Sequence, residues 1–447
     1  MNLDKFDIAD VTSALEKGLI CAKELVDLQL NKIKQEQEDL NCYVILDTKQ
    51  AQVAATLSDQ RRKDNKSLSA LDGIPIAVKD NLNVHNLPTR NGSKFTHPIN
   101  GDADVIRVLR DSGAIIIGKL NMDECAIGGT TNNPHYGPTF NPWKTGFVPG
   151  GSSGGASSAV AGGLAWAAIG TDTLGSIRLP AAYCGVVGLK ATRDLISMNG
   201  IVPLSPSLDH VGPLCRSVRD ARTFLHILAG SNIQFSSKEK REAILSQSRF
   251  GILESALGPS SDIAVTNAFE HAVEDLRRLG AYVTKVSLPD HDLNELRRSA
   301  FLFIEAESSK VLSKWVINHP DSYSKNLKSL LEYGRQISDK QLLKIKDKIA
   351  GAKIDIINLF KDIDFLITPT APQTAFSFSD PVPINQAEFT ALANIGGVPA
   401  ISLPCGISPS GLPLSFQLMA RPYGECGLLN AAESLEGIWG RLSLQKS

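Results

Sequence analysis

Apolar residues recur along the chain with two spacings, one typical of helices and one typical of strands. Helical spacing marks the ranges 8–36 (with a break at Gly18), 47–62, 103–112, 155–164, 178–184, 217–230, 262–279, most of 290–362, and 425–435. Short apolar runs bounded by turn residues predict strands at 73–80, 114–120, 166–171, 249–253, 282–288, 364–369, 398–404 and 413–419. Because strands lie on both sides of the long helical block, we predict an α/β fold with one mixed sheet shared across the chain.

Glycine-rich surroundings distinguish two serine sites near the middle of the chain. Ser152 and Ser153 lie in Gly-Gly-Ser-Ser-Gly-Gly, and Ser176 follows Gly175. Glycine lets a backbone adopt unusual dihedral angles or approach a ligand closely, and the apolar segments that follow disfavour a flexible linker. Ser176 falls between a predicted strand and a predicted helix, where free backbone N–H groups can bind an anion.

A serine hydroxyl becomes a good nucleophile only when a nearby base takes its proton. None of the eight histidines lies in a recognisable catalytic motif, so a lysine is the alternative, provided that burial lowers its pKa from about 10.4. Lys79, at the end of a predicted strand, is the candidate base. The strand by itself favours a different interpretation, because its period of two places Lys79 opposite Ile74, Ile76 and Val78, on a face open to solvent.

The overall composition narrows the classes of function. The 447 residues are 43% hydrophobic and 21% charged, with a formal net charge of −1, which is typical of a globular protein without a nucleic-acid surface. No apolar run is long enough to cross a membrane, and the acidic N-terminus lacks the pattern of an export signal, so we expect a cytoplasmic protein. The seven scattered cysteines form no CxxC motif, which argues against a zinc site or a disulfide framework.

Several motifs together identify the chain as a member of the amidase signature family. They are GIPIAVKD (73–80), NPW (141–143), GGSSGG (150–155), DTLGSIRLPAAYCGVVGLK (172–190), LDHVGPL (208–214) and GLPLSFQL (411–418). By resemblance to that family, Lys79 is the base of a Ser–cis-Ser–Lys triad, Ser152 follows a cis peptide bond and relays the proton, and Ser176 is the nucleophile that forms an acyl-enzyme. Such a mechanism supplies nucleophile and base without a cofactor or a metal ion, so we expect neither.

The resemblance also implies one amidase signature domain over residues 1–447, in which about eleven strands form a mixed sheet covered by helices on both faces. We expect four segments within it: N-terminal helices (1–64), a catalytic core (65–230), a mainly helical insertion with some strands (231–362), and C-terminal strands and a helix that complete the sheet (363–447).

Roles for the residues around the triad follow from the same resemblance. The oxyanion would meet backbone N–H groups of Thr173, Leu174 and Gly175, together with that of Ser176. The supporting residues would be Ser153 and the ion pair of Asp172 with Arg178. The substrate would contact Ala126, Gly128, Gly129 and His135. Leu174 departs from the glycine that is common in the family, and it adds apolar bulk near the acyl site.

The predicted activity is hydrolysis of a C–N bond in a small carboxamide or ureide, which releases ammonia or an amine. The loop 131–139 resembles that of carboxybiuret hydrolase-like amidases. The alternative is the glutamine-hydrolysing A subunit of a glutamyl-tRNA(Gln) amidotransferase, which NMDE (121–124) and TPTAP (368–372) resemble. Glutamine handling there needs an acidic residue and an arginine, for which the segments 386–390 and 327–331 offer no clear match. We expect a small-molecule amide as partner, with no direct nucleic acid and no membrane; a homodimer or a small partner subunit stays open.

Overall fold

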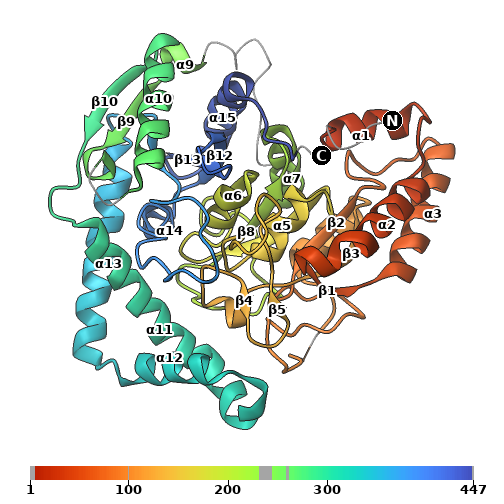
Figure 1. Ribbon diagram of the computed structural model, residues 1–447, viewed down its shortest axis with the longest axis horizontal. Coiled ribbons are helices and arrows are strands. Elements are labelled where there is room, and N and C mark those ends of the chain that lie inside the picture. Colours follow the sequence, from red (N-terminus) through yellow and green to blue (C-terminus); the bar gives the residue numbers. More distant parts are fainter. Residues whose placement is uncertain (1–5, 99, 231–243, 258–260, 445–447) are drawn as a thin grey trace.

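A single mixed sheet runs through the protein (Figure 1). The computed structural model describes residues 6–98, 100–230, 244–257 and 261–444. In spatial order the eleven strands are β1 (Tyr43–Leu46), β3 (Ile115–Leu120), β2 (Pro75–Lys79), β6 (Ala167–Asp172), β8 (His210–Cys215), β7 (Val187–Lys190), β12 (Ala400–Ile407), β13 (Pro413–Ala420), β11 (Phe365–Pro369), β9 (Arg249–Leu253) and β10 (Tyr282–Val286). This confirms the predicted fold class and strand number, and all four predicted segments contribute strands to the sheet.

The strands at the centre of the sheet are buried on both faces. β2 runs parallel to β3 and β6, and every residue of these three strands is buried. Strands that are covered on both faces need no alternation of polar and apolar residues. The period-two interpretation that placed Lys79 in solvent is therefore wrong, because this side chain is completely buried.

Three strands of the sheet escape the sequence patterns, namely β1, β7 and β8. β8 pairs antiparallel with β6 and β7, although it contains Pro213, which pairs with Ile169. A proline inside an apolar run argues against a central strand, since it donates no hydrogen bond to the ladder. β1 and β7 have four residues each, too few to show a period. These three strands form because of their pairing with neighbouring strands of the sheet, and local sequence patterns do not predict them.

Helices cover both faces of the sheet. α5 (Gly154–Ala161) packs against α6 (Arg178–Cys184), and α7 (Val218–Ala229) packs against α15 (Glu425–Trp439), with α6 and α15 on opposite faces of β12 and β13. The other helices around the sheet are α1 (Ile8–Glu16), α2 (Ala22–Leu40), α3 (Thr48–Lys63), α4 (Asp104–Asp111), α9 (Ile244–Gln247), α10 (Ile263–Arg278) and α14 (Ala391–Gly396). Among the helices of the described ranges, none is long and apolar enough to span a bilayer.

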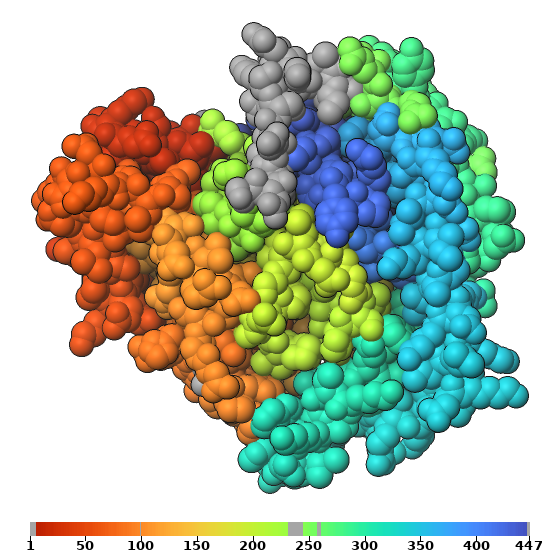
Figure 2. Space-filling model, turned by 180° about the vertical axis from the view of Figure 1, so that it is seen from behind, coloured from red at the N-terminus to blue at the C-terminus, as the bar shows by residue number. Residues whose placement is uncertain are grey.

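Three further helices form an arm beside the sheet, seen at the lower left of Figure 1: α11 (Leu293–Asn318), α12 (Lys325–Gln336) and α13 (Asp339–Leu359). Phe303 and Ile304 of α11 join Met122 and Ala126 in a buried apolar cluster. Figure 2 shows the arm from behind, in teal and cyan, beside the yellow-green segment between β7 and β8. Glu307 of α11 accepts hydrogen bonds from two serines of that segment. The arm therefore lies over the loops that follow β3 and β7.

Two glycines allow the packing of the sheet to be tested against a matched control. A Cβ atom at Gly212 in β8 would overlap the carbonyl oxygen of Leu189 in the neighbouring strand, whereas one at Gly351 in α13 would meet nothing within 4 Å. We expect Gly212→Ala to lower the free energy of unfolding by about 1–3 kcal/mol. Gly351→Ala should raise it by about 0.5–1 kcal/mol, because alanine favours a helix interior.

Urea denaturation of both variants, followed by circular dichroism, checks this prediction. Equal unfolding midpoints for Gly212→Ala and the wild type would show that β8 is less tightly packed than described.

Candidate active site

Lys79 lies at the end of β2 with its ammonium group directed at two hydroxyl groups. Lys79 Nζ is 2.8 Å from Ser152 Oγ and 2.9 Å from Thr171 Oγ1. Thr171 Oγ1 also accepts a hydrogen bond from the Asn81 side chain at 3.1 Å. β2 and β6 are adjacent parallel strands, so their ends bring Lys79 and Thr171 together. The contact between Lys79 and Ser152 is the one expected between the base and the relay serine.

The peptide bond between Gly151 and Ser152 is cis, as the family resemblance implies. No side chain fits at Gly151, because a Cβ atom there would overlap the Asp123 carboxylate. Ser153, the next residue, exchanges weak hydrogen bonds with the backbone of Thr171, and its N–H donates to the carbonyl oxygen of Ser176 at 3.3 Å. Ser153 thereby connects the serine motif both to β6 and to the turn that contains Ser176, which we call the nucleophile turn.

Ser176 lies in the turn from β6 to α6, which a buried ion pair holds in shape. Arg178 binds Asp172 in bidentate fashion, with both N–O distances 3.0 Å and both side chains completely buried. The Asp172 carboxylate also accepts the backbone N–H of Gly175 at 2.8 Å and that of Ile177 at 3.3 Å. Although burial acts to raise the pKa of Asp172, the charge of Arg178 holds it below its usual range. The pairing of Asp172 with Arg178 agrees with the structural role expected for them.

The turn offers backbone N–H donors for an oxyanion, but Gly175 differs from the prediction. Gly175 gives its N–H to Asp172, so this predicted donor is already occupied. The N–H groups of Thr173, Leu174 and Ser176 have no acceptor within the part of the chain that the structure describes. The Ser176 hydroxyl likewise makes no hydrogen bond to another described residue, and Ser176 is 9% exposed. The turn thus presents a hydroxyl and three N–H groups that a ligand can engage.

The pKa of Lys79 reflects opposing effects of burial and neighbouring charge. Burial lowers the pKa of Lys79 to about 7, although carboxylates of Asp123, Asp209 and Asp172 act in the opposite direction. Burial also raises the pKa of Asp123 and of Asp209 to about 6 each, against their hydrogen bonds and the lysine charge. A neutral amine is therefore accessible near neutral pH, which is the form that can accept a proton.

The predicted substrate-binding residues fall into two groups. Ala126 has a positive φ of 61° and lies in the buried cluster beneath α11, which the half-buried Leu174 also contacts. Gly128 packs against Asp123, since a Cβ atom would lie 2.5 Å from that carboxyl carbon, and Gly129 packs on the side-chain amide of Gln386. These three residues lie on the loop beside Gly151. Their contact with a substrate remains a prediction.

His135 belongs to the second group, because its ring binds a protein partner. In the small hairpin of β4 (Asn132–Asn133) and β5 (Gly137–Pro138), His135 Nε2 lies 2.7 Å from Glu124 Oε1. Glu124 also accepts hydrogen bonds from the backbone and hydroxyl of Ser324, which caps α12. These contacts favour a structural role for His135, in which it ties the loop to the helical arm.

Three polar residues of the site have no role in the prediction from the sequence: Thr171, Asp123 and Asp209. Asp209 accepts the Thr173 hydroxyl at 2.6 Å and the N–H groups of Leu204 and Ser205. Asp123 and Asp209 lie inside two of the segments that carried the resemblance, which was the only signal for them. Their nearness to Lys79 depends on the packing of distant loops and has no trace in residue spacing.

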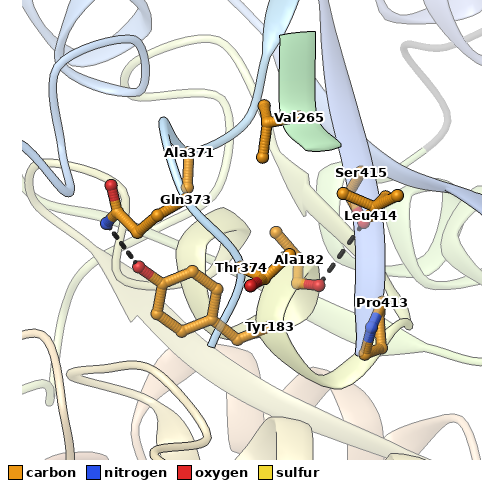
Figure 3. A pocket seen from close by; sticks show the side chains of 9 residues that line it. All are labelled: Ala182, Tyr183, Val265, Ala371, Gln373, Thr374, Pro413, Leu414 and Ser415. Atoms are coloured by element: carbon orange, nitrogen blue, oxygen red, sulfur yellow. Dashed lines mark hydrogen bonds between the residues drawn. The ribbon is translucent and has the colours of Figure 1, made fainter. Parts of the chain in front are cut away.

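A surface hollow lies elsewhere, beside the C-terminal part of α6 (Figure 3). Its lining comes from α6, α10, β13 and the segment after β11: Ala182, Tyr183, Val265, Ala371, Gln373, Thr374, Pro413, Leu414 and Ser415. None of the triad residues lines it. The hollow is therefore separate from the residues that the family resemblance predicts to be catalytic.

Known proteins of similar sequence and fold show the family of the chain. An amidase family model matches residues 24–429. The chain is 33% identical over 476 aligned residues to the A subunit of glutamyl-tRNA(Gln) amidotransferase from Halothermothrix orenii, covering 98% of each protein. A crystal structure of an amidase superimposes with a TM-score of 0.90 at 30% identity, covering 97% of this chain and all of the other.

A second solved structure is described as "an unexpected vestigial protein complex" that reveals the origins of an s-triazine catabolic enzyme. It matches with a TM-score of 0.89 at 28% identity, over 99% of this chain and 100% of that chain. Fold and comparisons define an amidohydrolase that acts on C–N amide bonds. The chain belongs to the amidase signature family.

The lowered pKa of Lys79 predicts the pH dependence of the enzyme. A base works only when deprotonated, so kcat/KM should be low under acidic conditions, rise through about pH 7 and then level off. Lys79→Ala should lower kcat by about 10²–10⁴-fold and abolish this rise. Initial rates between pH 5 and pH 9 measure both effects, with circular dichroism as the check on folding. A rise centred near pH 10, or an unaltered profile in Lys79→Ala, would identify a different base.

Proposed function

We propose that the protein hydrolyses a neutral carboxamide or ureide through Ser176, Ser152 and Lys79. The observation that carries the proposal is the 2.8 Å contact between the buried Lys79 amine and the Ser152 hydroxyl. Neutral Lys79 takes the proton of Ser152, and Ser152 takes the proton of Ser176 as the latter attacks the amide carbonyl. The unengaged N–H groups of the nucleophile turn stabilise the oxyanion.

The rest of the cycle follows from reversing the same proton transfers. The proton held by Lys79 passes back through Ser152 to the departing nitrogen, so ammonia or an amine leaves and Ser176 keeps the acyl group as an ester. Water then attacks this ester, gives its proton to the same relay and releases the acid. Ser176 regains its proton at the end of the cycle.

The surroundings of the site support an uncharged substrate. A zwitterionic amino acid brings an ammonium and a carboxylate, and each needs an opposite charge to offset several kcal/mol of desolvation. In the arm, Leu327 and Leu331 pack in an apolar cluster with Cys125. Lys328, between them in sequence, binds the carbonyl oxygen of Pro320. The arm segment that corresponds to the arginine-bearing segment of glutamine-dependent relatives thus contributes buried leucines, and its lysine binds a backbone oxygen.

Glutamine remains the second candidate substrate, and the curated relatives favour it over a small amide. The relative from Halothermothrix orenii is an amidotransferase component that aligns over nearly its whole length. With glutamine as substrate, the chain would act beside partner subunits. We also propose a cytoplasmic location, which the seven free cysteines support.

Replacement of the nucleophile provides the first test of the mechanism. Ser176→Ala should lose turnover and labelling by a fluorophosphonate, because no covalent adduct can form. Ser152→Ala should be labelled more slowly than the wild type, since it keeps the nucleophile but lacks the relay. Ser329→Ala, on the exposed side of α12, is the matched control. Fluorescence of the labelled band after electrophoresis is the measurement, and full labelling of Ser176→Ala would disprove the assignment.

A comparison of substrates distinguishes the two candidates. We expect ammonia release from biuret or a simple carboxamide to exceed that from glutamine, because the segment 327–331 supplies no arginine to pair with the carboxylate of an amino acid. Coupled ammonia detection over a range of concentrations gives kcat/KM for each compound. If glutamine proves the best substrate, or if a co-purifying partner stimulates its hydrolysis, the protein is better interpreted as an amidotransferase subunit than as a small-amide hydrolase.

A further inference from the structure

Three side chains form a series of hydrogen bonds that runs from the hollow of Figure 3 to the loop that carries Gly129. Gln373 Nε2 lies 2.7 Å from the Tyr183 hydroxyl, which in turn lies 3.4 Å from Gln386 Oε1. An amide nitrogen can only donate, so the Tyr183 hydroxyl accepts from Gln373 and gives its own proton to Gln386. Burial raises the pKa of Tyr183, so the hydroxyl keeps this proton. The hydrogen bonds therefore run in one direction, from Gln373 to Gln386.

This direction fixes the orientation of the Gln386 amide. With Oε1 held by Tyr183, the NH₂ group faces away from it. A Cβ atom on Gly129 would lie 3.2 Å from Gln386 Nε2, so the amide packs directly on the Gly129 backbone. Within the described ranges no acceptor takes a hydrogen bond from Nε2, although Gln386 is only 8% exposed. The nitrogen is therefore available to donate a hydrogen bond to a ligand or to a water molecule.

Gly129 also borders the catalytic serines. A Cβ atom on Gly151 would lie 2.8 Å from the carbonyl carbon of Gly129, and Gly151 is bonded to Ser152. The Gln386 amide therefore packs on the Gly129 backbone, and this backbone in turn packs against Gly151, next to the relay serine. A side chain at position 129 would press on the Gln386 amide, so glycine keeps the amide in this place.

We propose that Gln386 determines specificity by donating a hydrogen bond from Nε2 to an uncharged oxygen of the substrate, a second carbonyl beside the scissile amide. The inference rests on the proposed function and narrows its substrate class to ureides and diamides. The acceptor is uncharged because Gln386, Tyr183 and Gln373 bring no positive charge, while the Asp123 carboxylate lies against Gly151 and repels an anion. A simple aliphatic amide has no oxygen for this donor.

Biuret and isopropylurea form a matched pair of probes for this contact. The two molecules have the same branched skeleton of heavy atoms, but isopropylurea carries methyl groups in place of the second carbonyl oxygen and the second amino group of biuret. The measurement is the concentration of each probe that halves the rate of fluorophosphonate labelling at Ser176 in the full-length protein. This readout needs binding alone and does not depend on turnover of either probe.

We expect biuret to protect the wild type at a concentration at least about tenfold lower than isopropylurea, because a site built to hydrogen-bond an oxygen rejects an analogue without it. In Gln386→Met, which keeps the length but removes the donor, protection by biuret should weaken about tenfold and that by isopropylurea should stay constant. Gln386→Glu, of the same shape and without a donor when ionised, should also lose the preference. Tyr183→Phe should lose part of it, since only the orientation of the amide is affected.

The control is Gln52→Met on the exposed face of α3, which should keep the wild-type ratio. A wild type that shows no preference for biuret would overturn the inference. A preference for biuret that both Gln386 variants retain would also overturn it. So would an equal weakening of protection by both probes, because that result indicates that Gln386 has a purely structural role. Absence of labelling at Ser176 in the wild type would instead disprove the proposed function, so the two failures are distinguishable.

Discussion

The buried ion pair between Asp172 and Arg178 holds together the parts of the structure on which catalysis depends. Asp172 ends β6 and accepts two N–H groups of the nucleophile turn, while Arg178 begins α6. Arg178 also binds Gln417 of β13 and the side chain of Asn394 in α14. Two charges in such a place are stable only when every donor and acceptor is satisfied. Here the satisfied pair joins the turn to two elements that lie more than two hundred residues later in the chain.

A second constraint is the balance of charge at Lys79. Burial by itself lowers the pKa of a lysine, so that the amine loses its proton more readily. At Lys79 the charges of three nearby carboxylates oppose this shift of the pKa. Hydroxyl groups of Ser152 and Thr171 hold the amine in place without adding charge. The result is an amine that changes protonation close to neutrality, as the proposed proton relay between two serines requires.

The fold could be predicted from the sequence, and the residues of the triad could be proposed, because the signals for both are local. Apolar runs marked β2, β3 and β6, and the glycine-framed serine motifs identified the family. β8 could not be predicted, because Gly212 and Pro213 are unfavourable in a strand and β8 forms through its pairing with β6 and β7. The occupied N–H of Gly175 and the pairing of His135 with Glu124 were also missed, because hydrogen bonds to a particular acceptor depend on tertiary geometry.

The order of strands in the sheet has a consequence for synthesis of the protein. β7, which follows the nucleophile turn, pairs with β12, and the ion pair of the turn is completed only by α14 and β13. Lys79 and both serines emerge from the ribosome well before these elements do. A nascent chain that ends before β13 therefore contains Lys79, Ser152 and Ser176 but lacks the partners of Arg178 that shape the turn around Ser176. We therefore expect this turn to take its final shape only when the polypeptide is complete.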